Sequence, residues 1–225
     1  MQLYIGNKNY SSWSLRPWLL LTHEGIPFEE VRLRLSFDDG SPFKNALAAV
    51  TPSGRVPVLV DEGLAVWDTL AIAEYLAEKH TARPLWPAQA QQRARARSLC
   101  AEMHSGFGAL RNACPMNIEA SLPEVGRRVA TEWPDVAADL RRIDAMWSEQ
   151  LEASRGPFLF GEFGIVDAYY APVCSRVRTY ALPLGAAALA YVERIHALPA
   201  MREWCAAARD EHDFIADDEP YRQRV

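Results

Sequence analysis

The sequence lacks the features that mark membrane, secreted and nucleic-acid-binding proteins. No apolar run approaches the roughly 18 residues that a bilayer-spanning helix needs. The N-terminal residues MQLYIGNKNY do not follow the charged, apolar and small-residue order of a signal peptide. Lys and Arg number 24 against 29 Asp and Glu, which gives a formal net charge of −5. We therefore expect neither a membrane nor a nucleic acid as partner.

Cysteine and histidine are also sparse. The chain has four cysteines, and their spacing fits neither a disulfide framework nor a zinc site. Its five histidines are scattered, without the i, i+4 pairing of a metal-binding helix. We expect no metal, and we expect a reducing, cytoplasmic location. The cysteines are Cys100, Cys114, Cys174 and Cys205.

The first 80 residues alternate between β-type and helical periodicity, which predicts a small α/β sheet domain. Two β-type runs separated by Asp61-Glu62-Gly63 predict a β-hairpin. The expected strands are residues 2–6, 28–35, 56–60 and 64–67, and the expected helices are residues 14–24, 43–49 and 69–79.

After a proline-containing link at residues 81–89, strand signals almost vanish. The sequence thus predicts an α/β domain over residues 1–81 and an all-helical domain over residues 88–225. The polar, acidic tail over residues 214–225 is expected to wrap the surface. The helices expected in the second domain cover residues 91–111, 136–153, 167–180, 186–196 and 199–209.

Pro57 stands at the entrance of the β-type run Val56 to Val60. Local sequence favours an ordinary edge-strand proline, because proline cannot donate to a ladder. The alternative is a cis Val56–Pro57 peptide, which would leave the Val56 N–H and C=O free to pair with the backbone of a peptide-like ligand.

Two further segments place polar groups at helix N-termini. Asp68 and Thr69 lie at the N-terminus of the helix expected over residues 69–79, where they can cap it or help to hold a ligand carboxylate. The segment NYSSWSLRP at residues 9–17 follows the first strand, and its hydroxyls lie where the helix dipole favours negative charge. Taken alone, each segment is better explained by plain helix capping.

In this order and spacing, the three segments resemble those of the glutathione S-transferase superfamily. SSWSLRPW is similar to the Ser-Ser-x-Ser-x-Arg motif of the serine-type classes, the zeta (maleylacetoacetate isomerase-like) class especially. GRVPVLV resembles the cis-proline loop of that family, and WDTLAIAEYL resembles its next helix start. The resemblance covers nearly the whole chain. It implies a thioredoxin-like N-terminal domain followed by an all-α domain.

The resemblance also implies roles for individual residues. Ser11 would be the catalytic residue whose hydroxyl donates to the glutathione sulfur, with Ser12 and Tyr10 as alternative donors. Asp68 would meet the γ-glutamyl ammonium and Thr69 its carboxylate. The residues expected to bind glutathione are Ser12, Trp13, Arg55, Val56, Pro57, Asp68 and Thr69, with the Val56 backbone on the cysteinyl part and Arg55 near the glycyl carboxylate.

The helix after the link would face the active site in this family. Met103, His104 and Phe107, together with Tyr10, are therefore expected to line an electrophile pocket, although core packing is as good an account of Met103 and Phe107. Trp13 stands where the zeta motif has cysteine, which departs from the isomerase pattern. Gly164 and Asp167 resemble the capping box of the family's buried helix, a structural feature.

The resemblance implies a glutathione transferase in which glutathione is the cosubstrate and its thiolate attacks a small electrophile. One alternative is a glutathione-dependent cis–trans isomerase of the maleylacetoacetate type. The other is a non-catalytic binding protein that keeps the fold. A homodimer is expected from the resemblance alone.

Overall fold

The computed structural model describes residues 1–80 and 82–222, so the expected domain boundary at residue 81 and the last three residues of the tail lie outside it. The four strands form one sheet in the order β2-β1-β3-β4. β1 pairs with β2 in parallel, and the pairs β1–β3 and β3–β4 are antiparallel. The strands are β1 (Gln2–Ile5), β2 (Glu29–Arg32), β3 (Val58–Asp61) and β4 (Leu64–Trp67).

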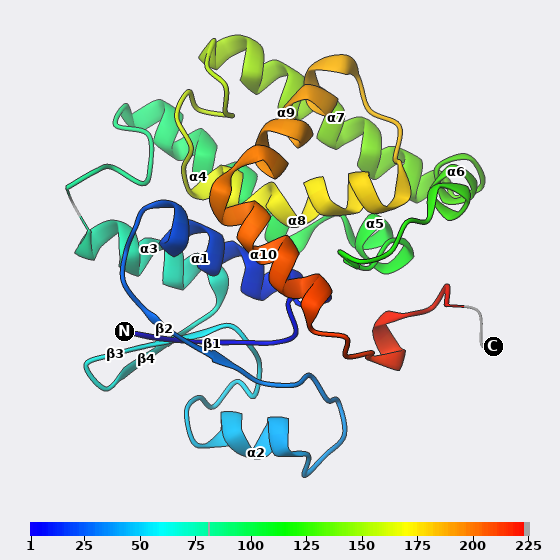
Figure 1. Cartoon of the computed structure of the whole chain (residues 1–225). Helices are drawn as coiled ribbons and strands as arrows, with labels where there is room; N and C mark the ends of the chain where they lie inside the picture. The colour runs from blue at the N-terminus through cyan, green and yellow to red at the C-terminus, as the bar shows by residue number, and fades with distance from the viewer. Residues whose placement is uncertain (81, 223–225) are drawn as a thin grey trace.

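Three helices accompany this sheet: α1 (Ser12–His23), α2 (Pro42–Ala48) and α3 (Thr69–Lys79). α1 and α3 cover the face toward the helical part, and α2 lies on the opposite side (Figure 1). The edge strand β2 is short and carries charged side chains, which discourages pairing with another sheet. The predicted α/β alternation is confirmed, with each of these elements near its expected position.

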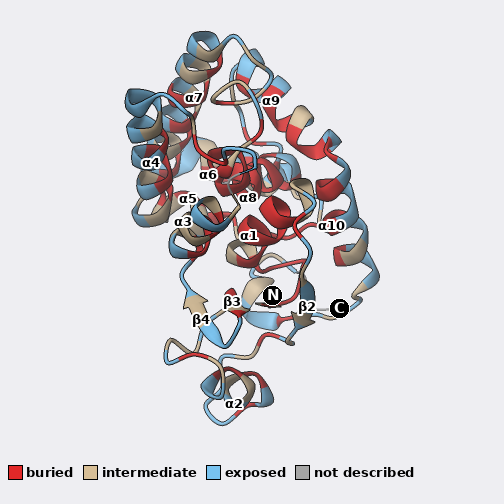
Figure 2. Ribbon diagram, turned by 90° about the vertical axis from the view of Figure 1, so that its left-hand side faces the viewer, coloured by how far each residue is buried: buried red, intermediate tan, exposed pale blue. Residues whose placement is uncertain are grey.

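The second part is helical throughout, apart from isolated bridges near residue 160. α8 lies at its centre and is buried along nearly its whole length (Figure 2). α1 packs against α8 and α10, so the two parts share one apolar core. The helices are α4 (Ala90–Ser105), α5 (Gly108–Ala113), α6 (Pro123–Glu132), α7 (Pro134–Ser154), α8 (Ile165–Tyr180), α9 (Ala186–Ala197) and α10 (Pro199–Asp210), followed by a 3₁₀ turn, η1 (Ala216–Asp218).

The single helix expected over residues 91–111 is wrong. α4 ends at Ser105, Gly106 adopts an extended conformation, and Phe107 has a left-handed backbone with φ 54° before α5 begins. A Cβ at Gly106 would lie 2.7 Å from the Glu102 carbonyl oxygen, so only glycine fits this close turn. α6 was not expected, although Pro123 stands at its first turn, as is typical of a helix start.

The capping-box contact expected between Asp167 and Gly164 is confirmed. The Asp167 carboxylate accepts from the Gly164 N–H at 3.0 Å at the start of α8. It also accepts from the Leu159 N–H at 3.1 Å and from the Tyr191 hydroxyl at 2.9 Å, which ties α8 to the preceding loop and to α9. Within residues 1–80 and 82–222, no helix is long and apolar enough to cross a membrane.

Candidate active site

Two adjoining cavities lie where the α/β part meets the helical part, and Trp13, Arg55 and Val56 line both. The narrower cavity has a volume of about 260 Å³ and the larger about 660 Å³. The narrower cavity is also lined by Ser53, Pro57, Trp67, Asp68, Thr69 and His104. The larger is also lined by Tyr10, Ser11, Ser12, Leu35, Phe37, Phe43, Lys44, Gly54, Arg111, Asn112, Pro115, Met116, Arg176 and Asp218.

The turn between β1 and α1 places Ser11 and Ser12 on the wall of the larger cavity. The Ser11 N–H donates to the Asn7 carbonyl at 2.8 Å, which fixes the turn. The Ser11 hydroxyl donates to Ser14 Oγ at 2.7 Å, and Ser14 Oγ also accepts from the Gly6 N–H at 3.1 Å. Ser11 makes no side-chain cap bond to α1. Its hydroxyl is therefore free of helix capping and lies at the positive end of the helix dipole.

The Val56–Pro57 peptide bond is cis and lies at the boundary between the two cavities. The ladder of β3 begins only at Val58, which pairs with Tyr4. In the part of the chain that the structure describes, neither the N–H nor the C=O of Val56 makes a hydrogen bond. This peptide group is available to an extended ligand.

A chain of polar contacts links the start of α3 to the helical part. The Thr69 and Tyr169 hydroxyl oxygens are 2.7 Å apart, and the Tyr169 oxygen lies 3.2 Å from His104 Nδ1. His104 Nε2 is 3.4 Å from Asp68 Oδ2, and Asp68 Oδ1 accepts from the Leu70 N–H at 2.9 Å. Burial raises the pKa of Tyr169 to about 12, so its hydroxyl stays protonated. Among the described residues, no protein group accepts a hydrogen bond from the Thr69 N–H at the start of α3.

Arg16 is buried beneath Trp13 and Tyr169. Its guanidinium carbon lies 3.9 Å from the Trp13 ring centroid and 4.4 Å from that of Tyr169, and its Nε donates to the Tyr169 carbonyl at 3.1 Å. Burial lowers the pKa of Arg16 to about 10, which still leaves it charged at neutral pH. The motif arginine therefore has a stacking role that orients Trp13 at the site.

Four cationic side chains line the larger cavity, and of these only Arg55 was predicted from the sequence. Lys44, Arg111 and Arg176 also line it, against the single carboxyl of Asp218. The sequence gives no signal that distinguishes Arg176 from its neighbour Arg178 in α8. Burial raises the pKa of the Asp218 carboxyl to about 6, so it gains a proton in mildly acidic solution.

Arg176 is held by neutral acceptors. Its Nε donates to the Cys114 carbonyl at 2.8 Å, and its Nη1 donates to the Pro172 carbonyl at 3.3 Å. Its Nη2 donates to the Ser12 hydroxyl at 3.4 Å, which places the guanidinium beside the serine turn. Burial lowers the pKa of Arg176 to about 10, so the group remains cationic near neutral pH.

Of the four residues expected in an electrophile pocket, two line a cavity and two do not. Met103 lies on the buried face of α4, and Phe107 is buried after the end of that helix, so both belong to the core and line neither cavity. His104 lines the narrower cavity. Tyr10 does line the larger cavity, but its hydroxyl donates to Glu219 Oε1 at 2.7 Å, and burial with this bond raises its pKa. Tyr10 is thus a poor donor to a thiolate.

No cysteine is among the described residues that line the two cavities. All four cysteines are free and buried, and burial raises the pKa of each thiol, that of Cys114 to about 12. Across residues 1–80 and 82–222, no group of three or more His, Cys, Asp or Glu side chains could hold a metal ion.

Comparison with known proteins identifies relatives along nearly the whole chain. Over 195 residues the chain is 28% identical to maleylacetoacetate isomerase of Pseudomonas aeruginosa, covering 83% of this chain and 85% of that protein. A crystal structure of maleylacetoacetate isomerase from Methylobacterium extorquens with bound malonate and glutathione superposes with a TM-score of 0.67 at 25% identity, covering 93% of this chain and 97% of that one. A maleyl pyruvate isomerase, a bacterial glutathione S-transferase of the zeta class, gives 0.69 at 22% identity, covering 95% and 100%.

Two family matches together account for most of the sequence. Residues 10–79 match the glutathione S-transferase N-terminal domain, and residues 88–207 match the glutathione S-transferase C-terminal domain. The segments that carry the resemblance in sequence fall within the first match, and the helical core falls within the second. The chain belongs to the glutathione S-transferase family.

Proposed function

We propose that this chain is a serine-type glutathione transferase that binds glutathione across the two cavities and activates its thiol. The observation that carries this proposal is that three ligand-facing elements line one continuous site. These are the serine turn, the unpaired Val56 peptide and the start of α3.

We propose that glutathione binds this site in one direction. Its γ-glutamyl carboxylate would accept from the Thr69 N–H at the start of α3, and Asp68 would meet its ammonium. The Val56 peptide would pair with the cysteinyl backbone, and Arg55 would meet the glycyl carboxylate. Because Val56 lines both cavities, this pose places the thiol at their boundary, facing the wall that carries Ser11.

The serine hydroxyl and the helix N-terminus at this turn supply about the free energy that thiol activation requires. A free thiol has a pKa near 8.5, and lowering it by two units takes about 2.7 kcal/mol. A hydroxyl bond to a thiolate contributes about 1.5–3 kcal/mol and a helix N-terminus about 0.5–1 kcal/mol. The Ser11 proton would turn from Ser14 to the sulfur. The thiol proton leaves to solvent. The sulfur lone pair forms the new bond to the electrophilic carbon, and the leaving group, such as halide from an aryl halide, departs with the electron pair of the bond that breaks.

The charge of the larger cavity favours an electrophile that carries carboxylates. Arg111 and Arg176 lie where such a substrate would meet the thiolate, with Lys44 on the α2 side. This observation supports a second candidate, a cis–trans isomerase of a maleylacetoacetate-type diketo acid, the activity for which several relatives are named. In that reaction, the thiolate adds to the double bond, the central bond rotates, and glutathione leaves unconsumed.

Three measurements separate the functions. Calorimetry should detect glutathione binding to the whole chain, and a protein that binds none would be the non-catalytic alternative. With an aryl halide, a transferase consumes one glutathione per product and releases halide. With a cis-diketo acid, an isomerase changes the ultraviolet spectrum of the substrate while the free thiol concentration stays constant.

A homodimer and a cytoplasmic location remain proposals. The edge strand β4 exposes Leu64 and Trp67, whose apolar side chains are about half exposed and suit an interface with a second copy. Light scattering coupled to size exclusion should give twice the mass of the chain. A Leu64→Glu variant should shift the mass toward that of one chain if this edge forms the interface.

A further inference from the structure

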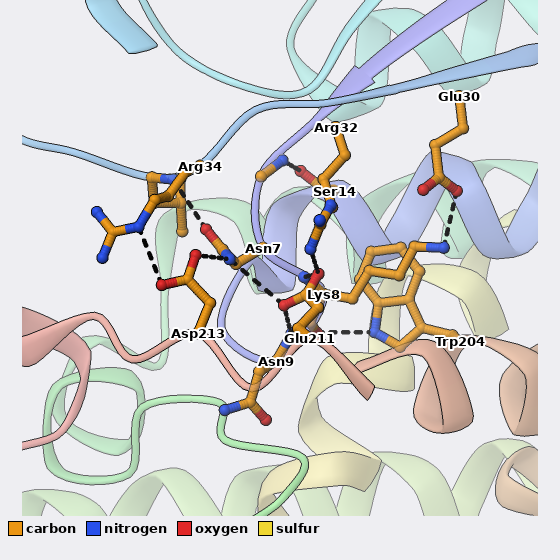
Figure 3. Close-up of polar contacts among 12 residues, drawn as sticks. Asn7, Lys8, Asn9, Ser14, Glu30, Arg32, Arg34, Trp204, Glu211 and Asp213 are labelled. Carbon is orange, nitrogen blue, oxygen red and sulfur yellow. Dashed lines mark hydrogen bonds and ion pairs between the residues drawn. The ribbon is translucent and has the colours of Figure 1, made fainter. Parts of the chain in front are cut away.

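A buried carboxylate from the C-terminal end of the chain holds the loop that carries the proposed catalytic serine. Figure 3 shows Glu211 and Asp213 pointing at this loop, here called the serine loop (residues 7–11). Glu211 Oε1 accepts from the Lys8 N–H at 2.7 Å, and Oε2 accepts from the Asn9 N–H at 3.4 Å. The side chain of Glu211 is only 4% exposed. One carboxylate thus satisfies two successive backbone donors of the loop.

The same carboxylate is balanced by a cation and extended by an amide. Arg32 of β2 pairs with Glu211 at 3.0 Å, and Asn7 Nδ2 donates to Glu211 at 3.4 Å. Asn7 Nδ2 also donates to Asp213 at 3.1 Å, and Asp213 pairs with Arg34 at 2.9 Å. A buried ion with this many donors holds a defined geometry, because losing either partner leaves an uncompensated charge.

Asn7 connects Glu211 and Asp213 to Ser11. The Asn7 carbonyl accepts from the Ser11 N–H at 2.8 Å, while the Asn7 side chain accepts from the Leu35 N–H at 2.8 Å. On the other side, the Lys8 carbonyl accepts from Trp204 Nε1 of α10 at 3.0 Å. The position of Ser11 therefore depends on Asn7, whose side chain Glu211 and Asp213 bind, and the neighbouring Lys8 backbone is held by Glu211 and Trp204.

From this geometry we infer that Glu211 is a positioning residue for the thiol chemistry, acting through the serine loop from outside both cavities. The inference rests on the proposed function, because it assumes that Ser11 meets the glutathione sulfur. Glu211 lines neither cavity, so it contacts neither glutathione nor the electrophile. Its removal should displace the Ser11 hydroxyl while leaving Asp68, Thr69 and Val56 in place, since these stand on other elements.

The test compares Glu211→Gln and Glu211→Ala with Asp210→Asn in the full chain. Asp210 is exposed and makes no side-chain hydrogen bond or ion pair among the described residues, so this control removes the same charge next to Glu211. The thiolate absorbance of bound glutathione is titrated against pH, and kcat and KM for glutathione are measured with an aryl halide. Amide hydrogen exchange of the peptide covering residues 5–12 reports on the loop without glutathione.

In Glu211→Gln, we expect faster exchange in the loop peptide, a rise of about one unit in the pKa of the bound thiol, and about a 10-fold fall in kcat below that pKa. KM for glutathione should change less than about 2-fold, since the recognition groups stay in place. Glu211→Ala should show larger changes in the same order, and Asp210→Asn should match the wild type.

Two results would overturn the inference. One is wild-type loop exchange in both Glu211 variants. The other is a lower melting temperature with an unchanged thiol pKa at temperatures where the variants are folded, which would make Glu211 a stabilising residue only. If the wild-type chain forms no thiolate, the proposed function fails by itself, and loop exchange still decides whether Glu211 holds the loop.

Discussion

Replacing Ser11 by alanine tests the proposed chemistry with little disturbance of the fold. Among the described residues, the Ser11 hydroxyl bonds only to Ser14 Oγ, which keeps its bond from the Gly6 N–H at 3.1 Å when Ser11 is changed. Ser11 also makes no side-chain cap to α1, so alanine removes no capping bond. We therefore expect Ser11→Ala to fold and to bind glutathione nearly as well as the wild type.

The expected loss is confined to the ionised thiol. A hydrogen bond to a charged group contributes about 1.5–3 kcal/mol. Since one pKa unit corresponds to about 1.36 kcal/mol, the pKa of the bound thiol should rise by about 1–2 units. At a pH below the wild-type value, the thiolate fraction and the conjugation rate should fall about 10- to 100-fold.

The measurement is the thiolate absorbance of bound glutathione as a function of pH, with aryl halide kinetics beside it. Ser12→Ala is the matched control, because its hydroxyl loses only a contact from Arg176 at 3.4 Å. If Ser11→Ala keeps the wild-type thiol pKa while Ser12→Ala raises it, Ser12 is the donor. If neither variant raises it, activation by a serine hydroxyl is refuted.

Three further changes probe the cavity and the helical core. The probe is ethane-1,2-disulfonate, which stays a dianion across the pH range. It should inhibit the wild type more tightly as the pH falls through about 6, because protonation of Asp218 removes a negative charge from the cavity, and Asp218→Asn should tighten inhibition several-fold at pH 7 and remove this dependence. Gly126→Ala should lower the free energy of unfolding by about 3 kcal/mol in urea, since its Cβ would lie 1.7 Å from the Tyr180 carbonyl oxygen. Asp167→Ala should cost about 3 kcal/mol by the same assay, because the buried Tyr191 hydroxyl and two backbone N–H groups lose their acceptor.

The elements of the first domain could be predicted because their signals are local. The helix expected over residues 69–79 is α3, and the hairpin expected at residues 56–67 is β3–β4, since a turn and a cap each depend on neighbours in sequence. The break after α4 could not be read this way. Apolar periodicity continues through Gly106 and Phe107, and the turn there is set by the packing of α5 against α7.

The same distinction separates the site residues. Ser11, Val56 and Thr69 lie in short motifs, and the structure brings them to two cavities with a common wall. Met103 has helical spacing toward the site, but spacing gives no direction once the helix has neighbours on both sides. Glu211 meets Lys8 across 203 positions of sequence, and no local pattern reports such a contact.

The stability of the fold does not explain why a cationic side chain, Arg176, is buried in the wall of the larger cavity. Arg176 is 4% exposed, and within the described part of the chain no carboxylate lies within ion-pair distance of it. Removing a cation from water without an opposing charge costs stability, and an apolar residue in α8 would avoid that cost. Neutral oxygens hold the guanidinium, and Asp218 is the one carboxyl among the four cations that line the cavity, so a positive potential acts on whatever enters beside Ser12. An arginine held in this way stabilises an arriving anion, whether the thiolate of glutathione or a carboxylate of the electrophile.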